Sequence, residues 1–236
     1  MDGIDASIIK SDGNEFLEIV DDIYLKYDDQ LKSELKKVVD SCSSKEEFKK
    51  LSNSIKDIEK NLTLKHFQAC KLIIEKNKNI KIDIIGFHGQ TILHKPQDGY
   101  SIQIGDSRLL SKLTNTTVVS NFRENDILNG GQGAPLTPLY HFLILSKIKS
   151  KLPSALVNIG GIANITYVEN QSKIIGFDTG PGNYLIDNWV RDNAKMEFDD
   201  AGLLAKSGKL DEKLLNQTAN NTLRSLIIYT QNMTIN

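Results

Sequence analysis

Long hydrophobic runs are absent from this 236-residue sequence, and no apolar stretch is long enough to span a bilayer. The first residues carry no signal-peptide pattern. An excess of one sign of charge is also lacking, because 29 Lys and Arg residues stand against 30 Asp and Glu residues and leave a net charge of -1. We therefore expect a cytoplasmic protein that has neither a membrane nor a nucleic acid as its partner.

Cysteine is scarce, and its placement argues against both a disulfide and a zinc site. Cys42 and Cys70 lie in helical patterns without a close spacing, so we expect two reduced thiols. Among the four histidines, His88 and His94 have no third His or Cys at a spacing suited to zinc. We therefore predict no metal-binding residues.

Glycine, in contrast, is concentrated in polar loops, and one of these contains the first candidate for chemistry. Residues 176–183 read GFDTGPGN, after the β-type run 173–175 and before an amphipathic helical pattern at 184–190. Asp178 at a strand end is suited to take a proton from a hydroxyl or a water, and a glycine turn that begins a helix can hold phosphate. Together the two tasks describe a kinase. The alternative is a plain strand–turn–helix corner, with Asp178 as a turn residue and Asn183 as N-cap.

Two further glycine loops lie upstream. Residues 158–165 read NIGGIANI and join two β-type runs. Such a turn is an ordinary hairpin signal, and its shape also lets backbone amides approach a phosphate. Residues 129–136 read NGGQGAPL and precede a helical run at 139–148. Because each of the three loops lies at the boundary of an element, together they predict a cleft that binds a phosphate or a sugar.

A fourth loop offers hydrogen-bonding side chains. The apolar run 82–87 reads as a buried strand and leads directly into HGQTILH at 88–94. His88 and Gln90 have donors and acceptors suited to sugar hydroxyls, and a His-Gly-Gln corner has the flexibility and polarity of a binding loop. In the alternative interpretation, His88 is a strand-end residue that bonds only to neighbouring backbone.

Seven motifs, in order, resemble those of the anhydro-N-acetylmuramic acid kinase family of actin-like sugar kinases. They are DGID at 2–5, GFHGQT at 86–91, QIGD at 103–106, NFR at 121–123, GGQGAPL at 130–136, NIGGIAN at 158–164 and FDTGPGN at 177–183. The resemblance implies an ATP-dependent enzyme of peptidoglycan recycling and amino-sugar metabolism. Such an enzyme hydrolyses the 1,6-anhydro ring of 1,6-anhydro-N-acetylmuramic acid and phosphorylates O6, which gives N-acetylmuramic acid 6-phosphate.

The resemblance assigns Asp178 to the catalytic base that deprotonates the attacking water. It implies that Arg123 binds the lactyl carboxylate of the sugar or stabilises charge, since a guanidinium offers a planar fork of donors. The other residues implied to line the sugar pocket are His88, Gln90 and Thr91. The residues implied to bind ATP are Asp2, Gly3, Asp5, Gly160, Gly161, Gly180, Gly182 and Asn183. Mg²⁺ is expected with ATP, held mainly by phosphate oxygens and water.

The family pattern is interrupted in three places. Family members carry a first strand and a Gly-Thr-Ser loop before the DGID motif, and a second lobe longer than the one that ends here at residue 236. Asn121 stands where the family usually has Asp, which removes a charge beside Arg123. The alternative to an active kinase is therefore a catalytically inactive remnant of one. A different two-lobed phosphotransferase is disfavoured by the motifs at 86–91 and 130–136.

The resemblance implies an α/β protein with the actin-like ATPase, or RNase H-like, two-lobed fold, without the first strand and the end of the second lobe. Residues 1–150 would form the first lobe, and residues 151–236 a partial second lobe that carries Asp178. A sheet without its first strand exposes the edge of its neighbour, which invites pairing with another chain. The expected partners are the small-molecule amino sugar, ATP and, as a candidate assembly, a second copy in a homodimer.

Periodicity and turn residues predict the individual elements. Strands are expected at 2–9, 15–20, 82–87 and 116–121, with a hairpin through 92–104. Three helices are expected before residue 77. The first carries Leu31, Leu35 and Val38 on one face, the second opens with a capping box at Ser44 and Glu47, and the third covers 63–76. A further helix is expected at 106–113.

Overall fold

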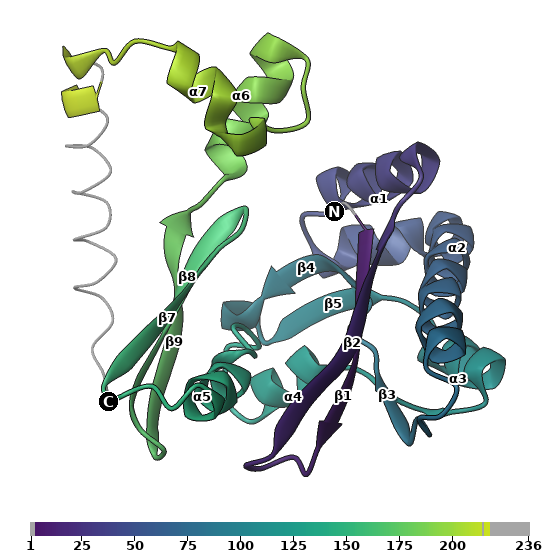
Figure 1. Ribbon diagram of the computed structural model, residues 1–236. Helices are drawn as coiled ribbons and strands as arrows, with labels where there is room; N and C mark the ends of the chain where they lie inside the picture. Colours follow the sequence, from purple (N-terminus) through teal and green to yellow (C-terminus); the bar gives the residue numbers. More distant parts are fainter. Residues whose placement is uncertain (1–2, 214, 218–236) are drawn as a thin grey trace. The chain divides into compact units, whose positions relative to one another are not determined.

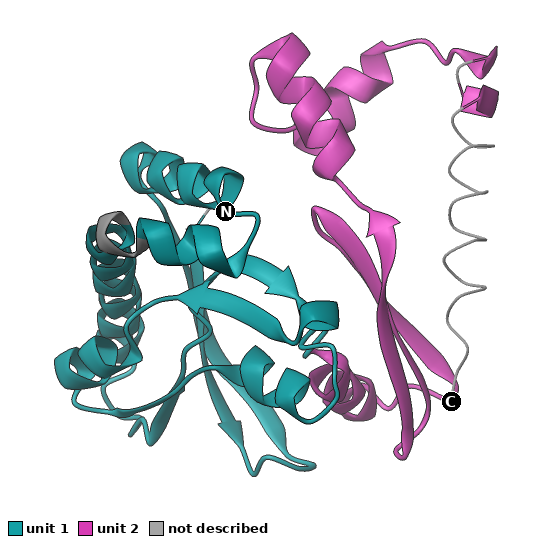
Figure 2. Ribbon diagram, turned by 180° about the vertical axis from the view of Figure 1, so that it is seen from behind, with its two compact units in different colours: residues 1–136 teal, residues 137–236 magenta. Residues whose placement is uncertain are grey.

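The computed structural model describes residues 3–213 and 215–217, without the side chains of residues 52–54. Asp2, which the resemblance assigns to ATP, lies outside the described residues. The chain divides into two compact units, Met1–Leu136 and Thr137–Asn236, which are teal and magenta in Figure 2. The expected boundary between residues 150 and 151 falls inside the second unit, and the assignment of lobes stays a prediction.

The first unit begins with two long strands, β1 (Gly3–Ser11) and β2 (Leu17–Lys26), that pair antiparallel (Figure 1). Asp12 closes the turn between them, because its Oδ1 accepts hydrogen bonds from the N–H groups of Asn14 and Phe16, both at 2.9 Å. These hydrogen bonds hold the pKa of Asp12 below its usual value, and the bond from Asn14 has the largest effect. Both strands are confirmed, although β2 begins and ends later than the sequence predicts.

Two helices follow, α1 (Asp29–Ser41) and α2 (Lys45–Lys76). The N-cap of α2 is confirmed, since Oγ of Ser44 accepts from the N–H of Glu47 at 3.2 Å. The carboxylate of Glu47 reaches back one residue further than a capping box requires, to the N–H of Ser43 at 2.7 Å. The prediction of two separate helices in this region is wrong, because α2 is continuous.

The continuity of α2 has a physical reason in its sequence. No glycine or proline interrupts residues 45–76. The buried residues Ile55, Leu62 and Ala69 recur at a constant interval of two helical turns, which keeps them on one face. Thr63 does not begin a helix; its Oγ1 donates to the carbonyl oxygen of Glu59, 2.7 Å away within the same helix.

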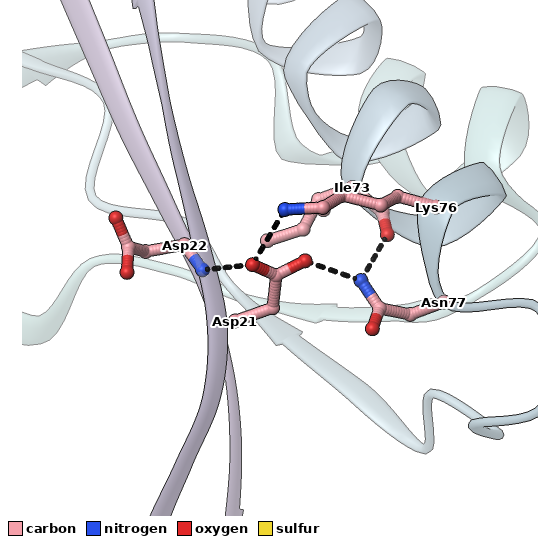
Figure 3. A network of polar contacts seen from close by, with 5 residues as sticks. All are labelled: Asp21, Asp22, Ile73, Lys76 and Asn77. Atoms are coloured by element: carbon pink, nitrogen blue, oxygen red, sulfur yellow. Dashed lines mark hydrogen bonds and ion pairs between the residues drawn. The ribbon is translucent and has the colours of Figure 1, made fainter.

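The end of α2 is tied to β2 by the carboxylate of Asp21 (Figure 3). Oδ1 of Asp21 accepts from Nζ of Lys76 at 2.8 Å, and Oδ2 accepts from Nδ2 of Asn77 at 2.7 Å. Nδ2 of Asn77 also donates to the carbonyl oxygen of Ile73 at 2.9 Å. The bond from Lys76, followed by that from Asn77, holds the pKa of Asp21 below its usual value. The carboxylate therefore stays ionised at neutral pH, and the link between the two elements is kept.

The core of the first unit lies between α1, α2 and the strands. Its buried residues are Ile4, Tyr27, Leu31, Leu35, Val38, Cys42, Ile55, Leu62, Ala69, Ile92, Leu93 and Ile104. Burying one large aliphatic side chain contributes about 1.5–3 kcal/mol, so this cluster fixes the two helices against the strands that lead to the site. Cys42 and Cys70 are free thiols, and burial raises the pKa of both.

Short elements complete the first unit. They are β3 (Ile84–Gly86), β4 (Gln90–Lys95), the 3-10 turn η1 (Pro96–Asp98), β5 (Tyr100–Ile104), α3 (Ser107–Thr114), β6 (Thr117–Val119) and α4 (Phe122–Leu128). The expected hairpin is confirmed as β4 and β5, which pair antiparallel, whereas β3 and β6 pair parallel. The strand expected at 82–87 is shorter and less buried than predicted, since Ile84 is 56% exposed.

The second unit contains a three-stranded antiparallel sheet and helices (Figure 2). Its elements are α5 (Pro138–Lys147), β7 (Ser154–Ile159), β8 (Ile162–Asn170), β9 (Lys173–Pro181), α6 (Tyr184–Ala194), η2 (Asp200–Gly202) and α7 (Leu203–Ser207). Nδ1 of His141 in α5 lies 2.6 Å from Oγ1 of Thr166 in β8, and both side chains are buried. Burial lowers the pKa of His141, so a neutral ring joins the helix to the sheet.

The described residues thus have a mixed α/β structure, whose strands form three two-stranded sheets and one three-stranded sheet. Within this described part, none of the helices combines the length and the apolar character needed to cross a membrane. The segments that follow the two strands of the parallel pair β3–β6 carry predicted site residues, His88 and Arg123.

Candidate functional site

The pair β3–β6 brings two predicted site residues to the same edge. Gly86 at the end of β3 pairs with Val119 at the end of β6. The N–H of Phe87 extends the pairing by donating to the carbonyl oxygen of Val119 at 2.8 Å. Because the carboxyl ends of parallel neighbours lie at one edge, His88 after β3 and Arg123 at the start of α4 become neighbours.

His88 and Arg123 are joined by a direct hydrogen bond. Nε of Arg123 donates to Nε2 of His88 at 2.8 Å, and Nδ1 of His88 lies 2.8 Å from the carbonyl oxygen of Gly89. Since a carbonyl oxygen only accepts and a guanidinium only donates, His88 carries its proton on Nδ1 and is neutral. The pKa of His88 is lowered accordingly, first by its partial burial and further by the charge of Arg123. The interpretation in which His88 bonds only to neighbouring backbone is wrong.

The glycine loop 129–133 holds Arg123 from a second direction. Nη1 of Arg123 donates to the carbonyl oxygen of Gly133 at 2.6 Å. The N–H of Gly133 in turn donates to Oδ2 of Asp126 at 2.6 Å. Gly133 has a φ of +67°, in the left-handed region that favours glycine. The guanidinium is therefore oriented by acceptors on two different segments of the chain.

Polar side chains continue from His88 along the β4–β5 hairpin. Nε2 of Gln103 donates to Oγ1 of Thr91 at 3.2 Å, and Nε2 of Gln90 donates to the carbonyl oxygen of Thr91 at 3.1 Å. The structure thus places all four residues predicted to bind the sugar, His88, Gln90, Thr91 and Arg123, in the first unit. It joins two of them directly, and the other two follow His88 along the chain.

Sequence reasoning missed the residues that anchor this region. Oε1 of Glu59 accepts from the N–H of Gly105 at 2.9 Å, and Oγ1 of Thr63 accepts from the N–H of Asp106 at 3.0 Å. Positions four apart on a helix share a face, so the spacing of Glu59 and Thr63 carried a signal. Asp126 was missed in the same way, although it lies inside the same stretch as the NFR and glycine motifs.

In the second unit the predicted phosphate loops meet. The N–H groups of Gly182 and Asn183 donate to the carbonyl oxygens of Gly161 and Gly160 at 2.8 and 2.7 Å. A Cβ on Gly182 would meet the carbonyl oxygen of Gly160, so this close approach requires glycine. The β7–β8 turn and the corner before α6 thus form one bonded structure, and its role in binding phosphate stays a prediction.

Asp178 lies within β9 rather than in a turn, so its interpretation as a turn residue is wrong. It is exposed and faces Asn164 across the β8–β9 pair. Two residues later, Gly180 has a φ of +138°, which only glycine adopts readily. Asn183 occupies the N-cap position of α6, but its side chain donates to the carbonyl oxygen of Ile159 at 3.4 Å and does not cap the helix.

Two further residues assigned to ATP lie on β1, where Gly3 faces Lys26 and Asp5 faces Tyr24 on β2. Across residues 3–213 and 215–217, no group of three or more His, Cys, Asp or Glu side chains is placed to hold a metal ion. A magnesium ion that enters with a nucleotide is held mainly by phosphate oxygens and water. The residues predicted to bind ATP could therefore accept it without a cluster of protein ligands.

Comparison with known proteins gives a consistent result. The family model for anhydro-N-acetylmuramic acid kinase matches residues 1–226. The anhydro-N-acetylmuramic acid kinase of Pelagibacter ubique (strain HTCC1062) is 47% identical over 223 residues, which cover 94% of this chain and 59% of the relative. That of Agrobacterium fabrum (strain C58 / ATCC 33970) is 36% identical over 219 residues, which cover 91% of this chain and 59% of the relative. The chain therefore spans about 59% of the length of these curated relatives.

Proposed function

This chain belongs to the anhydro-N-acetylmuramic acid kinase family, and we propose that it acts as an ATP-dependent kinase of 1,6-anhydro-N-acetylmuramic acid. The proposed reaction consumes the anhydro sugar, water and ATP and yields N-acetylmuramic acid 6-phosphate and ADP. It would serve peptidoglycan recycling in the cytoplasm. The observation that carries the proposal is the orientation of Arg123 by His88 and Gly133, at the place where the family motifs converge in the first unit.

Arg123 is suited to the carboxylate of the sugar's lactyl group. A guanidinium is always charged, and its donors form a planar fork that matches a carboxylate. Because His88 and Gly133 already hold the side chain, it loses less freedom when a ligand binds. Since His88 is neutral, it does not add a second charge, and Gln90 and Thr91 supply donors and acceptors suited to hydroxyl groups.

We assign the role of general base to Asp178. It takes a proton from water while the water oxygen attacks the anomeric carbon, and the bond between that carbon and O6 breaks. The freed O6 attacks the γ-phosphorus of ATP, and ADP leaves. The water oxygen remains as the new hydroxyl on the anomeric carbon, and Asp178 releases its proton to solvent. The exposure of Asp178 on β9 supports this role, because both water and a sugar can approach it.

We further propose that Gly3, Asp5, Gly160, Gly161, Gly180, Gly182 and Asn183 bind ATP. Bound Mg²⁺ would neutralise charge on the phosphates during transfer. The family supports an actin-like two-lobed fold for the whole protein, and a homodimer is the assembly that we propose.

One observation favours a second candidate, a chain that binds the sugar without transferring phosphate. The N–H groups of Gly182, Asn183 and Tyr184 donate to the carbonyl oxygens of the Gly160–Gly161 turn. These N–H groups are engaged within the protein, so phosphate would have to replace those bonds or use other donors. In this candidate the sugar residues of the first unit keep their role, and Asp178 has none.

Mass spectrometry of a reaction with the full chain separates the two candidates. The sample contains 1,6-anhydro-N-acetylmuramic acid and ATP with Mg²⁺, and a matched sample contains no ATP. A product heavier than the sugar by one water and one phosphoryl group, formed only with ATP, supports the kinase. Sugar that stays unchanged while it binds the chain supports the second candidate.

A further inference from the structure

We infer that Asp126 is a positioning residue that fixes the orientation of Arg123 through the glycine loop. Its importance for sugar binding rests on the proposed function, whereas its effect on Arg123 and His88 is a property of the first unit alone. Asp126 lies three positions after Arg123 on α4, so both side chains leave the same face of the helix.

Hydrogen bonds to both the side chain and the main chain of Asp126 hold the loop in place. Oδ2 of its carboxylate accepts from the N–H of Gly133 at 2.6 Å. Its backbone carbonyl accepts from the N–H of Gly131 at 2.8 Å. The side chain and the main chain of one residue therefore determine where the loop turns back over α4.

Gly133 passes this constraint on to Arg123. Its N–H is held by Asp126, and its carbonyl oxygen accepts from Nη1 of Arg123 at 2.6 Å. Gly133 is buried, and a Cβ there would lie 2.9 Å from Cδ1 of Ile127 and 3.1 Å from the carbonyl oxygen of Arg123. The loop thus lies directly on α4, and a change in the Gly133 N–H bond moves the acceptor of the guanidinium.

The position of the carboxylate also depends on Gly131. A Cβ built on Gly131 would overlap the carboxylate of Asp126, so glycine at this position leaves the space that the carboxylate occupies. A methyl group there would meet the end of one side chain rather than rigid backbone. Gly131→Ala is therefore a way to displace the Asp126 carboxylate from the loop side without altering Asp126 itself.

The connection ends at His88, whose Nε2 accepts from Nε of Arg123 at 2.8 Å. Hydrogen bonds at both Nε and Nη1 restrict the rotation of a guanidinium more than a bond at Nε alone does. If Asp126 releases Gly133, the bond at Nη1 of Arg123 is weakened, and so is the bond that keeps the proton of His88 on Nδ1.

The test uses the full chain and a readout that needs no ligand. Nitrogen-15 NMR of the imidazole rings reports which nitrogen carries the proton, and the His88 signals are identified by their loss in His88→Gln. We expect the Nδ1–H form in the wild-type chain. In Asp126→Ala and Gly131→Ala we expect a shift to a mixture with the Nε2–H form. Asp126→Asn keeps a side-chain oxygen that can accept from Gly133, so it should resemble the wild type, as should Glu124→Ala, which removes an exposed carboxylate from the same helix.

Sugar affinity, measured by calorimetry on the same variants, is the second readout. Weakening of the hydrogen bond from Arg123 to the carbonyl oxygen of Gly133 should raise the Kd for 1,6-anhydro-N-acetylmuramic acid by about tenfold in Asp126→Ala and Gly131→Ala. Folded Asp126→Ala and Gly131→Ala samples that keep the Nδ1–H form of His88 would overturn the inference. If Asp126→Ala does not fold, Gly131→Ala decides. If no sample binds the sugar but the tautomer shifts as expected, the positioning role stands and the proposed function fails.

Discussion

Nε of Arg123 and Nε2 of His88 are 2.8 Å apart, although the two residues lie 35 positions apart in the sequence. The parallel pairing of β3 with β6 creates this contact, because it places the residues after both strands at one edge. A charged fork is thereby held next to a neutral ring and a polar hairpin. The proposed recognition of the sugar rests most directly on this pair.

Replacing Arg123 should affect the two ligands unequally. Arg123→Ala removes a charged donor for the sugar carboxylate, so the Kd for the anhydro sugar should rise about 10- to 150-fold, while the Kd for ATP with Mg²⁺ stays near the wild-type value. Calorimetry with each ligand checks this. Arg123→Lys keeps the charge but not the fork and should give an intermediate loss. Equal losses for both ligands would remove Arg123 from the sugar site.

Asp178→Asn should stop turnover and leave the fold intact. The amide has the shape of the carboxylate but cannot accept a proton, and loss of a general base typically lowers the rate about 10²- to 10⁴-fold. Release of ADP in the presence of the sugar gives the rate, and circular dichroism with thermal unfolding checks the fold. Exposed Asp192 of α6 offers a matched control, since Asp192→Asn removes the same charge elsewhere in the second unit. Wild-type turnover in Asp178→Asn contradicts the assigned mechanism.

The link between Asp21, Lys76 and Asn77 should make stability depend on pH in a defined window. The folded-state pKa of Asp21 is lowered by Lys76 and then Asn77. A lowered folded pKa means that the stabilisation is fully present above the unfolded pKa, about 3.9, and is lost as pH falls through the folded value. Asp21→Asn should therefore be less stable than the wild type at neutral pH, and the difference should shrink below about pH 4. Denaturant unfolding across this range measures it. An unchanged difference at pH 3 and pH 7 would show that the ionised carboxylate does not hold α2 to β2.

Two leucines on α2 provide a matched test of the core. Leu62 is 0% exposed, whereas Leu64 is 39% exposed. Leu62→Ala should lower the free energy of unfolding by about 2–5 kcal/mol, because it leaves a cavity in the core. Leu64→Ala should cost less than about 1 kcal/mol, as a partly exposed side chain loses little burial. Similar losses for both variants in urea unfolding would show that α2 does not pack as described.

Local patterns in the sequence predicted those features that depend on a few neighbouring residues. The β4–β5 hairpin, the helix α3 and the glycine turn at Gly160 and Gly161 were all predicted from turn residues and periodicity. The continuous α2 was not, because Ser44 and Thr63 both resemble helix starts, and only burial of the face that carries Leu62 shows that the helix continues.

The candidate site, too, could be predicted from the sequence only in part. The residue type at His88 indicated sugar recognition, and the family resemblance implied that Arg123 binds a carboxylate, but the hydrogen bond between them depends on the pairing of two strands that are distant in sequence. The contact of Asp126 with Gly133, and those of Glu59 and Thr63 with the segment at residues 105–106, depend on how a loop packs on a helix. The spacing of Glu59 and Thr63 places both on one face of a helix, but the sequence does not show which segment that face contacts, so the folded structure is needed to reveal these contacts.

Calorimetric titration of the full chain with 1,6-anhydro-N-acetylmuramic acid tests the central claim most directly. The account predicts saturable binding with one site per chain, weakened in Arg123→Ala and unchanged in Glu124→Ala. Binding should occur without ATP, because the four residues assigned to the sugar all lie in the first unit. A folded chain that binds no sugar, or one whose affinity is the same in Arg123→Ala, would contradict it.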